Sequence, residues 1–545
     1  MNSAECLVTC LENEGTRFVF GLPGEETLAL YEALRDSSIR VVTCRHEQGA
    51  AFMADVHGRL TGSPGVCMST LGPGATNLIT GVADADLDRA PVVAITGQAS
   101  LDRTHKESHQ YLDLVSLFRP ITKWNAQIKR GEVVPEMVRH SFREAALEKP
   151  GATHLDLPED VADSPVRADA TPLPSQPLPQ PVPPEVELKQ AAEFLARSRN
   201  ALILAGNGVI RAGASEALRR FARSLNIPVA HTFMAKGVFP YDDPLAIMTA
   251  GIQARDYVAC GFEAADAIIC IGYDATEYAP KSWNPNREKP VLHIAPTPAE
   301  LDSYYTTAVE VVGDISEALN YLADAVTPRE ENIIPRLHDP VMRELRAYDA
   351  DTAVPFKPQR VISELHRVLA PEDIVVSDVG AHKVWVARMF PSSVPNTCVI
   401  SNGFASMGIS LPGAIAAKLV HPGRRVVAVA GDGGALMNIQ ELETAVRLGT
   451  PFVLLVFVDG MYGLIEWKQQ QRYGHSTEVG FGNPDWVALA ESFGARGARV
   501  TTNEELRPAL EWAVGLDSPV ILEVPVDSRE NLKLTEHLGD LVCPI

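Results

Sequence analysis

Two acidic residues lie directly after apolar runs, and their spacing predicts a shared cation. Asp432 lies in the glycine-rich stretch "GDGGALMNIQ" after the run "RRVVAVA", and Asp459 ends the run "PFVLLVFVD", 27 residues later. If both runs are neighbouring parallel strands, both carboxylates lie at the same sheet edge. A helix N-terminus attracts phosphate, and an aspartate there tolerates phosphate only with a divalent cation such as Mg²⁺ between them. Taken singly, each motif is equally a tight turn or a helix cap.

The elements that must position these residues are short apolar runs that alternate with amphipathic stretches along the chain. Examples are "GVCMSTLGPG" and "PVVAITGQ" in the first part, "NALILAGNG" and "DAIICIG" in the second, and the two runs above in the third. Runs that are apolar throughout suit parallel strands buried on both faces. We therefore predict an α/β fold with three doubly wound parallel-sheet domains, whose ligands bind at the glycine-rich turns.

Two stretches divide the chain into these domains. Eight prolines between Pro165 and Pro184 predict an extended linker, and a weaker boundary lies near "DTAVPFKPQR". The predicted division is an N-terminal domain over 1–165, a linker over 166–187, a central domain over 188–330, a second linker over 331–356, a C-terminal domain over 357–530 and a tail over 531–545.

Composition restricts the class of protein. The net charge of −21 argues against nucleic acid and anionic membranes as partners. The chain shows no signal-peptide pattern and no uninterrupted apolar window of about 18 residues, so we expect a cytoplasmic protein without a membrane span. The eight cysteines form no CxxC motif and no zinc-type cluster. We expect them to be mostly buried, reduced thiols.

The GDG stretch followed 27 residues later by a polar residue resembles the Mg²⁺-binding motif of thiamine diphosphate enzymes. In that family the GDG aspartate, an asparagine and a main-chain carbonyl two residues further on hold Mg²⁺ against the cofactor's diphosphate. The resemblance assigns these roles to Asp432, Asp459 and the carbonyl of Met461. Where the family commonly has Asn-Asn, this chain has Val458-Asp459. Catabolic acetolactate synthases look similar at this place, where they have "VDN".

Two stretches of the first part resemble the family's pyrimidine-binding region. The stretch "RHEQGAAFMADVHGRLTG" places Glu47 where the family has a glutamate that contacts the pyrimidine N1′. Such a carboxyl activates the cofactor by sharing a proton, and it needs a dry site. The alternative is a surface Glu in a first helical turn. In "STLGPGATNLITG", Pro73 lies in a turn and Asn77 at a helix start, and the alternative is an ordinary cap.

In the third part, "SDVGAHKVW" resembles the family's "VGQHQMW", and "SNGFASMGISLPG" resembles "GLGTMGYGLP". The carbonyl of Ala405 would accept from the cofactor's 4′-amino group, and Met407 would be the apolar wedge that bends the cofactor. His382 is either near the diphosphate or an ordinary helix-start histidine.

The full set that the resemblance places against the cofactor is Glu47, Pro73, Asn77, Val379, Gly380, Ala381, His382, Ala405, Met407, Gly431, Asp432, Gly433, Gly434, Asp459, Met461, Tyr462 and Gly463.

Two further stretches resemble catabolic acetolactate synthases in particular. They are "RTHKESHQYLDLVSLFRPITKW", similar to "HQSLD…LFQPITKY", and "ICIGYDATEYAPKSWN", similar to "TIGYDPIEYDPKFWN". The resemblance gives catalytic roles to Glu47, Gln110 and Met407, with Gln110 facing the site of a partner subunit and His109 beside it. Both could also be surface groups. The resemblance further implies a homodimer at least, more often a homotetramer, and leaves a regulatory subunit open.

The activity that the resemblance implies is that of an acetolactate synthase-like carboligase. It decarboxylates pyruvate on thiamine diphosphate and joins the product to a second 2-oxo acid, which gives 2-acetolactate. Lys468 stands where biosynthetic enzymes have Trp, so the acceptor stays open, and an acidic acceptor or a surface Lys are both alternatives. A simple 2-oxo acid decarboxylase, a carboligase with another acceptor and an inert cofactor-binding subunit are the rivals.

The central part predicts that FAD is not required. Biosynthetic acetolactate synthases carry "RFDDR" where this chain reads "GYDATEYAPK". The lone G-x-G of "LAGNGVIRAGA" is weak evidence for a dinucleotide.

Overall fold

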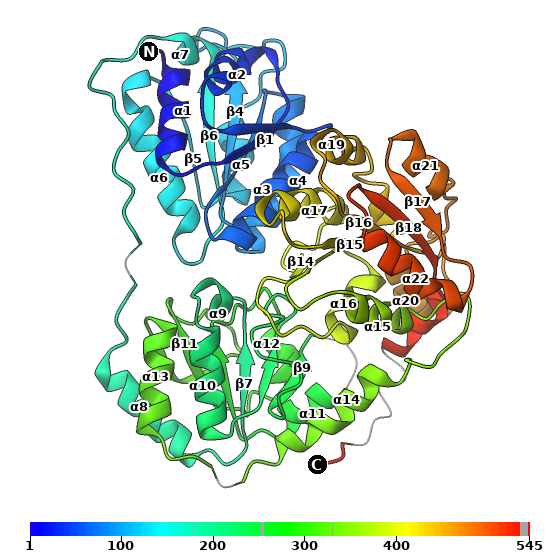
Figure 1. Ribbon diagram of the computed structural model, residues 1–545. Helices are drawn as coiled ribbons and strands as arrows, with labels where there is room; N and C mark the ends of the chain where they lie inside the picture. Colours follow the sequence, from blue (N-terminus) through cyan, green and yellow to red (C-terminus); the bar gives the residue numbers. More distant parts are fainter. Residues whose placement is uncertain (179, 252–255, 330, 535–542) are drawn as a thin grey trace.

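The protein folds into three α/β domains, each built on one six-stranded sheet (Figure 1). The computed structural model describes residues 1–545 except 179, 252–255, 330 and 535–542. Every strand pair in the three sheets is parallel. The prediction of three doubly wound parallel-sheet domains is therefore confirmed.

The N-terminal sheet has the strand order β2-β1-β3-β4-β6-β5. Its strands are β1 (Phe18–Gly21), β2 (Arg40–Thr43), β3 (Gly65–Ser69), β4 (Val92–Gln98), β5 (Trp124–Gln127) and β6 (Ala152–Pro158). Its helices are α1 (Ser3–Asn13), α2 (Leu28–Arg35), α3 (Glu47–Thr61), α4 (Pro73–Leu87), α5 (Leu114–Phe118), α6 (Val134–Ala146) and α7 (Glu159–Asp163).

The C-terminal sheet has the equivalent order, β14-β13-β15-β16-β18-β17. Its strands are β13 (Ile374–Ser377), β14 (Cys398–Ile400), β15 (Val426–Gly431), β16 (Val453–Val458), β17 (Arg496–Arg499) and β18 (Val520–Pro525). Its helices are α15 (Pro358–Val368), α16 (Ala381–Met389), α17 (Ser410–Val420), α18 (Asp432–Ala435), α19 (Glu441–Leu448), α20 (Gly463–Tyr473), α21 (Trp486–Ser492) and α22 (Asn503–Val514).

The central sheet differs from the other two, with the order β12-β11-β10-β7-β8-β9, which is the dinucleotide-fold order. Its strands are β7 (Ala201–Ala205), β8 (Val229–His231), β9 (Ala246–Thr249), β10 (Ala267–Ile271), β11 (Val291–Ala295) and β12 (Thr307–Val312). Its helices are α8 (Glu185–Arg197), α9 (Gly208–Arg211), α10 (Ser215–Leu225), α11 (Tyr257–Ala264), α12 (Pro280–Trp283) and α13 (Ile315–Ala325).

One apolar core joins the N-terminal and C-terminal domains. Helix α3 packs against α4 on one side and against α17 of the C-terminal domain on the other. Residues such as Phe52, Val56 and Ile415 of this shared core are fully buried. A helix that is buried on most of its circumference must be apolar nearly all round, which is what "GAAFMADV" provides. The two domains are thereby fixed against each other.

The two predicted linkers differ in structure. Between α7 and α8 the described residues form no helix or strand, and the chain runs extended beside the domains (Figure 1). The second predicted linker contains η4 (Ile334–Leu337) and α14 (His338–Arg346). Val341 and Leu345 of α14 are buried in the core of the C-terminal domain, so this segment is packed. No helix in the described part of the chain has the length and apolar character that a membrane crossing requires.

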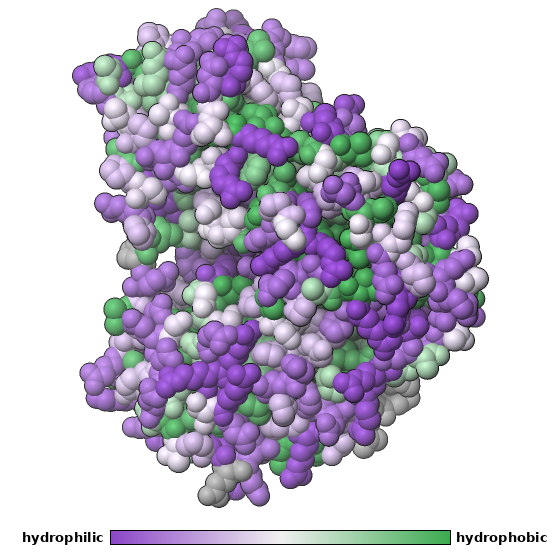
Figure 2. All heavy atoms as spheres, viewed as in Figure 1, coloured by the Kyte–Doolittle hydropathy of each residue, from purple (hydrophilic) through white to green (hydrophobic). Residues whose placement is uncertain are grey.

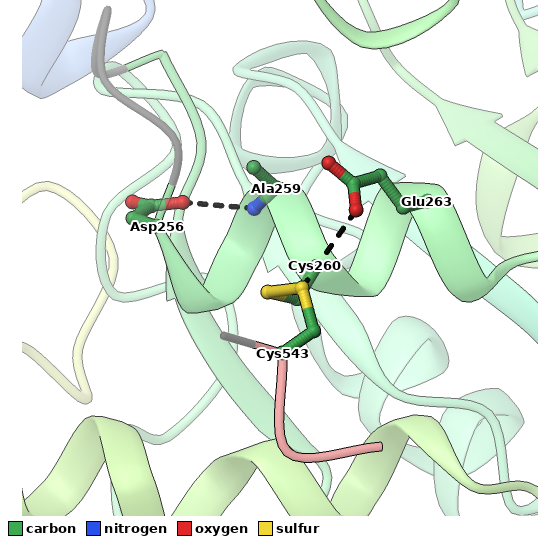
Figure 3. Close-up of a disulfide and its surroundings, with 5 residues drawn as sticks. All are labelled: Asp256, Ala259, Cys260, Glu263 and Cys543. Carbon is green, nitrogen blue, oxygen red and sulfur yellow. Dashed lines mark hydrogen bonds between the residues drawn. A yellow bond between two sulfur atoms is a disulfide. The ribbon is translucent and has the colours of Figure 1, made fainter. Parts of the chain in front are cut away.

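The cysteine prediction needs one correction. Cys260 on α11 and Cys543 near the C-terminus form a disulfide across 283 residues (Figure 3). Ile545 packs beside it on the central domain, so the end of the predicted tail is fastened to that domain. Spacing rules do not detect a pair this far apart in sequence. The other six cysteines are buried and free, as expected.

Candidate active site

The first two predicted metal ligands lie side by side at one sheet edge. Asp432 follows β15 and Asp459 follows β16, and these strands are parallel neighbours. Oδ2 of Asp432 accepts the main-chain N–H of Asp459 at 3.2 Å and that of Gly460 at 2.8 Å. After β15, residues 432–435 form the separate short helix α18, and the longer helix α19 starts at Glu441. Two consecutive glycines weaken a continuous helix at this point.

Burial makes this pair of carboxylates suited to a cation. Asp432 is 1% exposed. Burial, and next the charge of Asp432, raise the pKa of Asp459 to about 7. The described residues contain no group of three or more His, Cys, Asp or Glu side chains placed for a metal. Two carboxylates plus main-chain and phosphate oxygens are nevertheless the donor set that fits Mg²⁺.

Asn483 is a residue of this site that the sequence did not indicate. Its Nδ2 donates to Oδ2 of Asp432 at 2.8 Å. Its Oδ1 is buried, and no partner for it lies among the described residues. The carbonyl of Met461 accepts the N–H of Gly463 at 2.9 Å and retains a second lone pair. Carboxylate, amide and main-chain oxygens thus lie in the residues next to Asp432 and Asp459.

A cavity opens beside the two aspartates, at the carboxyl ends of β13, β15 and β16. Fourteen predicted cofactor-binding residues line it, namely Val379, Gly380, Ala381, His382, Ala405, Met407, Gly431, Asp432, Gly433, Gly434, Asp459, Met461, Tyr462 and Gly463. Its wall leaves little room at Gly433, since a Cβ there would lie 2.8 Å from the ring of Tyr462. A cavity wall made of main chain without side chains allows a diphosphate to approach the N–H groups.

His382 is buried in the wall of this cavity and is not a surface histidine. Burial lowers its pKa to about 4, so the imidazole is neutral at physiological pH. No partner for its Nε2 lies among the described residues. A buried polar atom without a partner at a cavity wall is a place where a ligand atom gains a hydrogen bond.

Ala405 and Met407 lie on the segment that connects β14 to α17. Ala405 has φ 59°, in the left-handed region that is rare for residues other than glycine. Strained main chain of this kind is concentrated at functional sites, where the surrounding structure holds it in place. The strain was not visible in the sequence, because alanine carries no such signal.

The remaining predicted residues form a second group on the N-terminal domain. Glu47 is the first residue of α3, is buried, and accepts Nδ2 of Asn77 at 2.9 Å through Oε2. Pro73 is the first residue of α4 and not part of a turn, since a proline there lacks only an N–H that has no helical partner. Asn77 is accordingly in the second turn of α4 and not at its start.

Gln110 lies against the same end of α4. A Cβ on Gly72, the N-cap of α4, would lie 2.7 Å from the carbonyl oxygen of Gln110. Gln110 has φ 56°, and both it and His109 are exposed. Within this chain, none of Glu47, Pro73, Asn77 and Gln110 lines the cavity beside Asp432. The predicted site residues therefore form two groups, one on each outer domain.

Lys468, the residue that left the acceptor open, lies on α20. Its Nζ lies 4.6 Å from the ring centroid of Trp467, and the side chain is half-buried. Burial lowers its pKa. It does not line the cavity, whereas Ile465, one turn earlier, does.

Comparison with known proteins places the chain in a family. Three thiamine pyrophosphate enzyme models match it, the N-terminal TPP binding domain at residues 1–117, the central domain at 188–322 and the C-terminal TPP binding domain at 378–524. These matches define the class of protein as a thiamine pyrophosphate enzyme.

Relatives narrow the class further. A "probable acetolactate synthase large subunit" of Methanocaldococcus jannaschii is 36% identical, over 100% of this chain and 96% of its own length. An "acetolactate synthase" of Bacillus subtilis is 36% identical, over 99% and 96%. An "acetolactate synthase, catabolic" of Raoultella terrigena is 35% identical, over 98% and 97%. The chain belongs to the acetolactate synthase family of thiamine pyrophosphate enzymes.

Proposed function

We propose that this protein is a thiamine diphosphate- and Mg²⁺-dependent carboligase that makes 2-acetolactate from two molecules of pyruvate. The observation that carries the proposal is that the predicted site residues form two groups, one on each outer domain. A buried, hydrogen-bonded carboxyl, Glu47, lies on one outer domain, and a cavity lined by glycines and by the neighbouring Asp432 and Asp459 lies on the other. Family membership supplies the chemistry that this arrangement fits.

The residues of the C-terminal domain would hold the cofactor's diphosphate. Asp432, Asp459 and the carbonyl of Met461 would bind Mg²⁺, and Asn483 keeps the carboxylate of Asp432 oriented. The neutral imidazole of His382 has a ring nitrogen available to a phosphate oxygen. The apolar side chain of Met407 and the carbonyl of Ala405 would fix the bend and the amino group of the cofactor. Bound there, thiamine diphosphate supplies the electron sink for decarboxylation.

Glu47 would exchange the activating proton. Its buried position at the N-terminus of α3 excludes water, and Asn77 fixes one of its oxygens, which leaves Oε1 for a ring nitrogen. General acid–base catalysis needs such a carboxyl in a fixed orientation within hydrogen-bond reach.

We also propose that the site is completed between two copies of the chain. Among the described residues of one chain, the N-terminal group does not line the cavity beside Asp432. Large apolar side chains are exposed near both, and they include Leu112, Phe404, Met437, Tyr462 and Ile465. Figure 2 shows a largely polar face with apolar side chains gathered where the N-terminal and C-terminal domains meet. A symmetric dimer would cover such surface and bring Glu47 of one copy to the cavity of the other.

The central experiment is product analysis with pyruvate, Mg²⁺ and thiamine diphosphate. We expect acetolactate, and acetaldehyde as the main product would instead indicate a decarboxylase. Adding 2-oxobutyrate identifies the preferred acceptor. Glu47→Gln should lower kcat at least about 100-fold with cofactor binding retained, because the amide cannot exchange the proton. Unchanged turnover in that variant would refute the proposed role.

Mixing two inactive variants tests whether the site spans two subunits. Glu47→Gln and Asp432→Ala each inactivate both sites of a homodimer, whereas the mixed dimer keeps one intact site. We expect random mixing to restore about a quarter of wild-type activity. No recovery would show that each site lies within one chain.

We propose in addition that no FAD is needed. A cavity between the three domains is lined by three cationic side chains, Arg59, Arg89 and Arg211, which could contact the diphosphate of a flavin nucleotide if they were free. Each of these guanidinium groups is already paired with a carboxylate, of Asp88, Asp274 and Glu148 respectively. A flavin absorption band in pure, active protein would contradict this proposal.

A further inference from the structure

The segment that carries Ala405 and Met407, residues 401–408, is here called the site loop. It leaves β14 of the C-terminal domain and enters α17. Both Ala405 and Met407 face the cavity, and Ala405 has a left-handed main chain. A non-glycine residue adopts this conformation only where neighbouring contacts impose it. The contacts that impose it here come largely from another domain.

Two aspartates of the N-terminal domain, Asp84 in α4 and Asp88 at its C-cap, accept hydrogen bonds from the site loop on both sides of Ala405. Asp88 accepts the N–H groups of Asn402, at 3.1 Å, and of Gly403. Asp84 Oδ1 accepts the hydroxyl of Ser401 at 2.8 Å and the N–H of Ser406 at 3.1 Å. The main chain is thus anchored at 402–403 and again at 406, with Ala405 between the anchors.

The end of the loop is held by its own domain. Asp378 accepts the N–H of Gly408 at 2.9 Å and that of Ser410 at 3.0 Å. The C-terminal domain therefore fixes the entry into α17, whereas the N-terminal domain fixes the part of the loop before and around Ala405.

Asp84 and Asp88 belong to a buried charge cluster that is costly to build. Arg59 of α3 pairs with Asp88 and with Asp55, and its Nη2 lies 3.9 Å from Oδ2 of Asp84. All three carboxylates are fully buried. Burial, and next Asp88 and Asp55, raise the pKa of Asp84 well above its ordinary value. Buried ion pairs add little net stability, so the cluster is better explained by the geometry it imposes.

We propose that Asp84 and Asp88 are positioning residues, which hold the site loop so that the Ala405 carbonyl and the Met407 side chain stand correctly in the cavity. This inference rests on the proposed function of that cavity. In this arrangement the N-terminal domain holds part of the neighbouring site from outside, where α3 also packs against α17 of the C-terminal domain.

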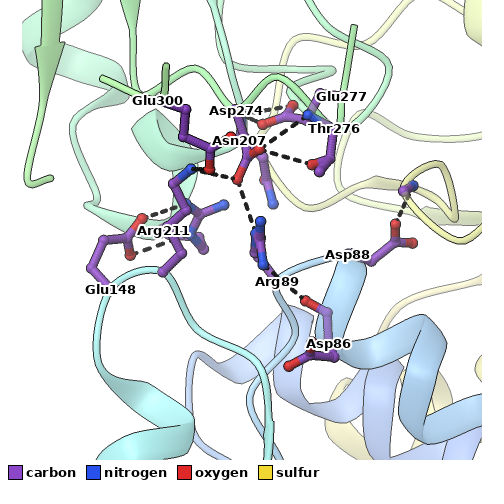
Figure 4. A network of polar contacts seen from close by, with 12 residues as sticks. Asp86, Asp88, Arg89, Glu148, Asn207, Arg211, Asp274, Thr276, Glu277 and Glu300 are labelled. Atoms are coloured by element: carbon purple, nitrogen blue, oxygen red, sulfur yellow. Dashed lines mark hydrogen bonds and ion pairs between the residues drawn. The ribbon is translucent and has the colours of Figure 1, made fainter. Parts of the chain in front are cut away.

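The first test measures the loop itself, by amide hydrogen exchange of the cofactor-free protein. Asp84→Ala removes the acceptor of the Ser406 N–H, so exchange of the site-loop peptide should rise at least about tenfold. Asp84→Asn keeps an oxygen at Oδ1 and should exchange like the wild type. Asp86, on the same helix, accepts the N–H of Ala152 within its own domain, and Figure 4 shows it beside Asp88. Asp86→Ala is therefore the matched control and should leave the loop unchanged.

The second test measures the reaction. A misplaced main chain near the reacting atoms should lower kcat about tenfold or more in Asp84→Ala, with KM for pyruvate and the cofactor dissociation constant within about threefold. Asp84→Asn should recover to within about threefold of the wild type. If Asp84→Ala does not fold, Ser401→Ala removes the hydrogen bond between the Ser401 hydroxyl and Asp84 from the loop side. In that variant, exchange of the site-loop peptide should rise and kcat should fall.

The outcomes separate this inference from the proposed function. Unchanged exchange in the loop, or faster exchange with unchanged kcat, would overturn the positioning role. An Asp84→Asn variant as impaired as Asp84→Ala would do the same. A wild type that makes no acetolactate would refute the proposed function instead, and the exchange experiment would still decide whether Asp84 holds the loop.

Discussion

Oε1 of Glu441 accepts the main-chain N–H of His46 at 2.9 Å, although the two residues are 395 positions apart. The same oxygen accepts the N–H of Arg45 at 3.0 Å. His46 is the N-cap of α3, and Glu47 follows it. The C-terminal domain therefore fixes where α3 begins and with it the orientation of Glu47. The contact also requires Gly49, since a Cβ there would lie 2.8 Å from the same oxygen.

Glu441→Ala should lower both stability and turnover. Two partly buried N–H groups would lose their acceptor, which costs about 1–3 kcal/mol, and a misoriented Glu47 should lower kcat about tenfold. Glu441→Gln keeps one acceptor oxygen and should recover most of both. Glu443, on the same helix, pairs with Arg447 near the surface. Glu443→Ala is the control, and equal effects from both alanine variants would show that Glu441 has no special role.

The effect of replacing Asp459 on cofactor affinity should depend on whether the new side chain still offers an oxygen ligand. Asp459→Asn keeps an oxygen ligand and removes one of two adjacent negative charges, so Mg²⁺–thiamine diphosphate should bind within about threefold of the wild type. Asp459→Ala should weaken binding about 10–100-fold. Titration calorimetry measures both, with Asp517→Ala, at an exposed position of the same domain, as control. Chelation of Mg²⁺ should release the cofactor, and a cofactor that stays bound would contradict the cation bridge.

The stability of the N-terminal domain should fall with rising pH because of Asp156 on β6. This carboxyl is 1% exposed, and burial raises its pKa to about 7. Because the folded-state pKa lies above the unfolded one, the stability from Asp156 is fully present below pH 4 and is lost as pH rises through 7. Between pH 5 and pH 8 the loss is about 2.5 kcal/mol.

Urea unfolding at both pH values measures this loss. Asp156→Asn should remove that part of the pH dependence, whereas Asp169→Asn, at an exposed position, should keep it. An equal pH dependence in the wild type and Asp156→Asn would disprove the assignment.

The disulfide predicts the number of free thiols in the protein. In denatured but unreduced protein, six of the eight cysteines should titrate as thiols, and reductant should raise the count to eight. Cys543→Ser should give seven thiols without reductant, because Cys260 is then released. A count of eight in unreduced wild type would mean that the pair is not bonded.

The fold was predictable where strands are buried on both faces. The apolar runs that precede Asp432 and Asp459 are inner strands, and a parallel strand in that position must be apolar throughout. The strands at the sheet edges carried much weaker signals. β2, β5 and β17 are four residues long and largely exposed or half-buried. At an edge the pairing partner and the adjoining segments decide strand formation, and local sequence does not record them.

The site was predictable where a residue's type is itself the signal. An aspartate between glycines after an apolar run can be found in the sequence alone. Asn483 and Glu441 could not be found in this way, because their importance lies in contacts that cross 51 and 395 residues. The same holds for Asp84, which reads as an ordinary polar residue of a helix until the site loop is seen beside it.

The strand orders have a consequence for the origin of the chain. The first and third sheets follow one connection plan, and the middle sheet follows another. Duplication of one ancestral domain, followed by insertion of an unrelated domain between the two copies, would give these strand orders.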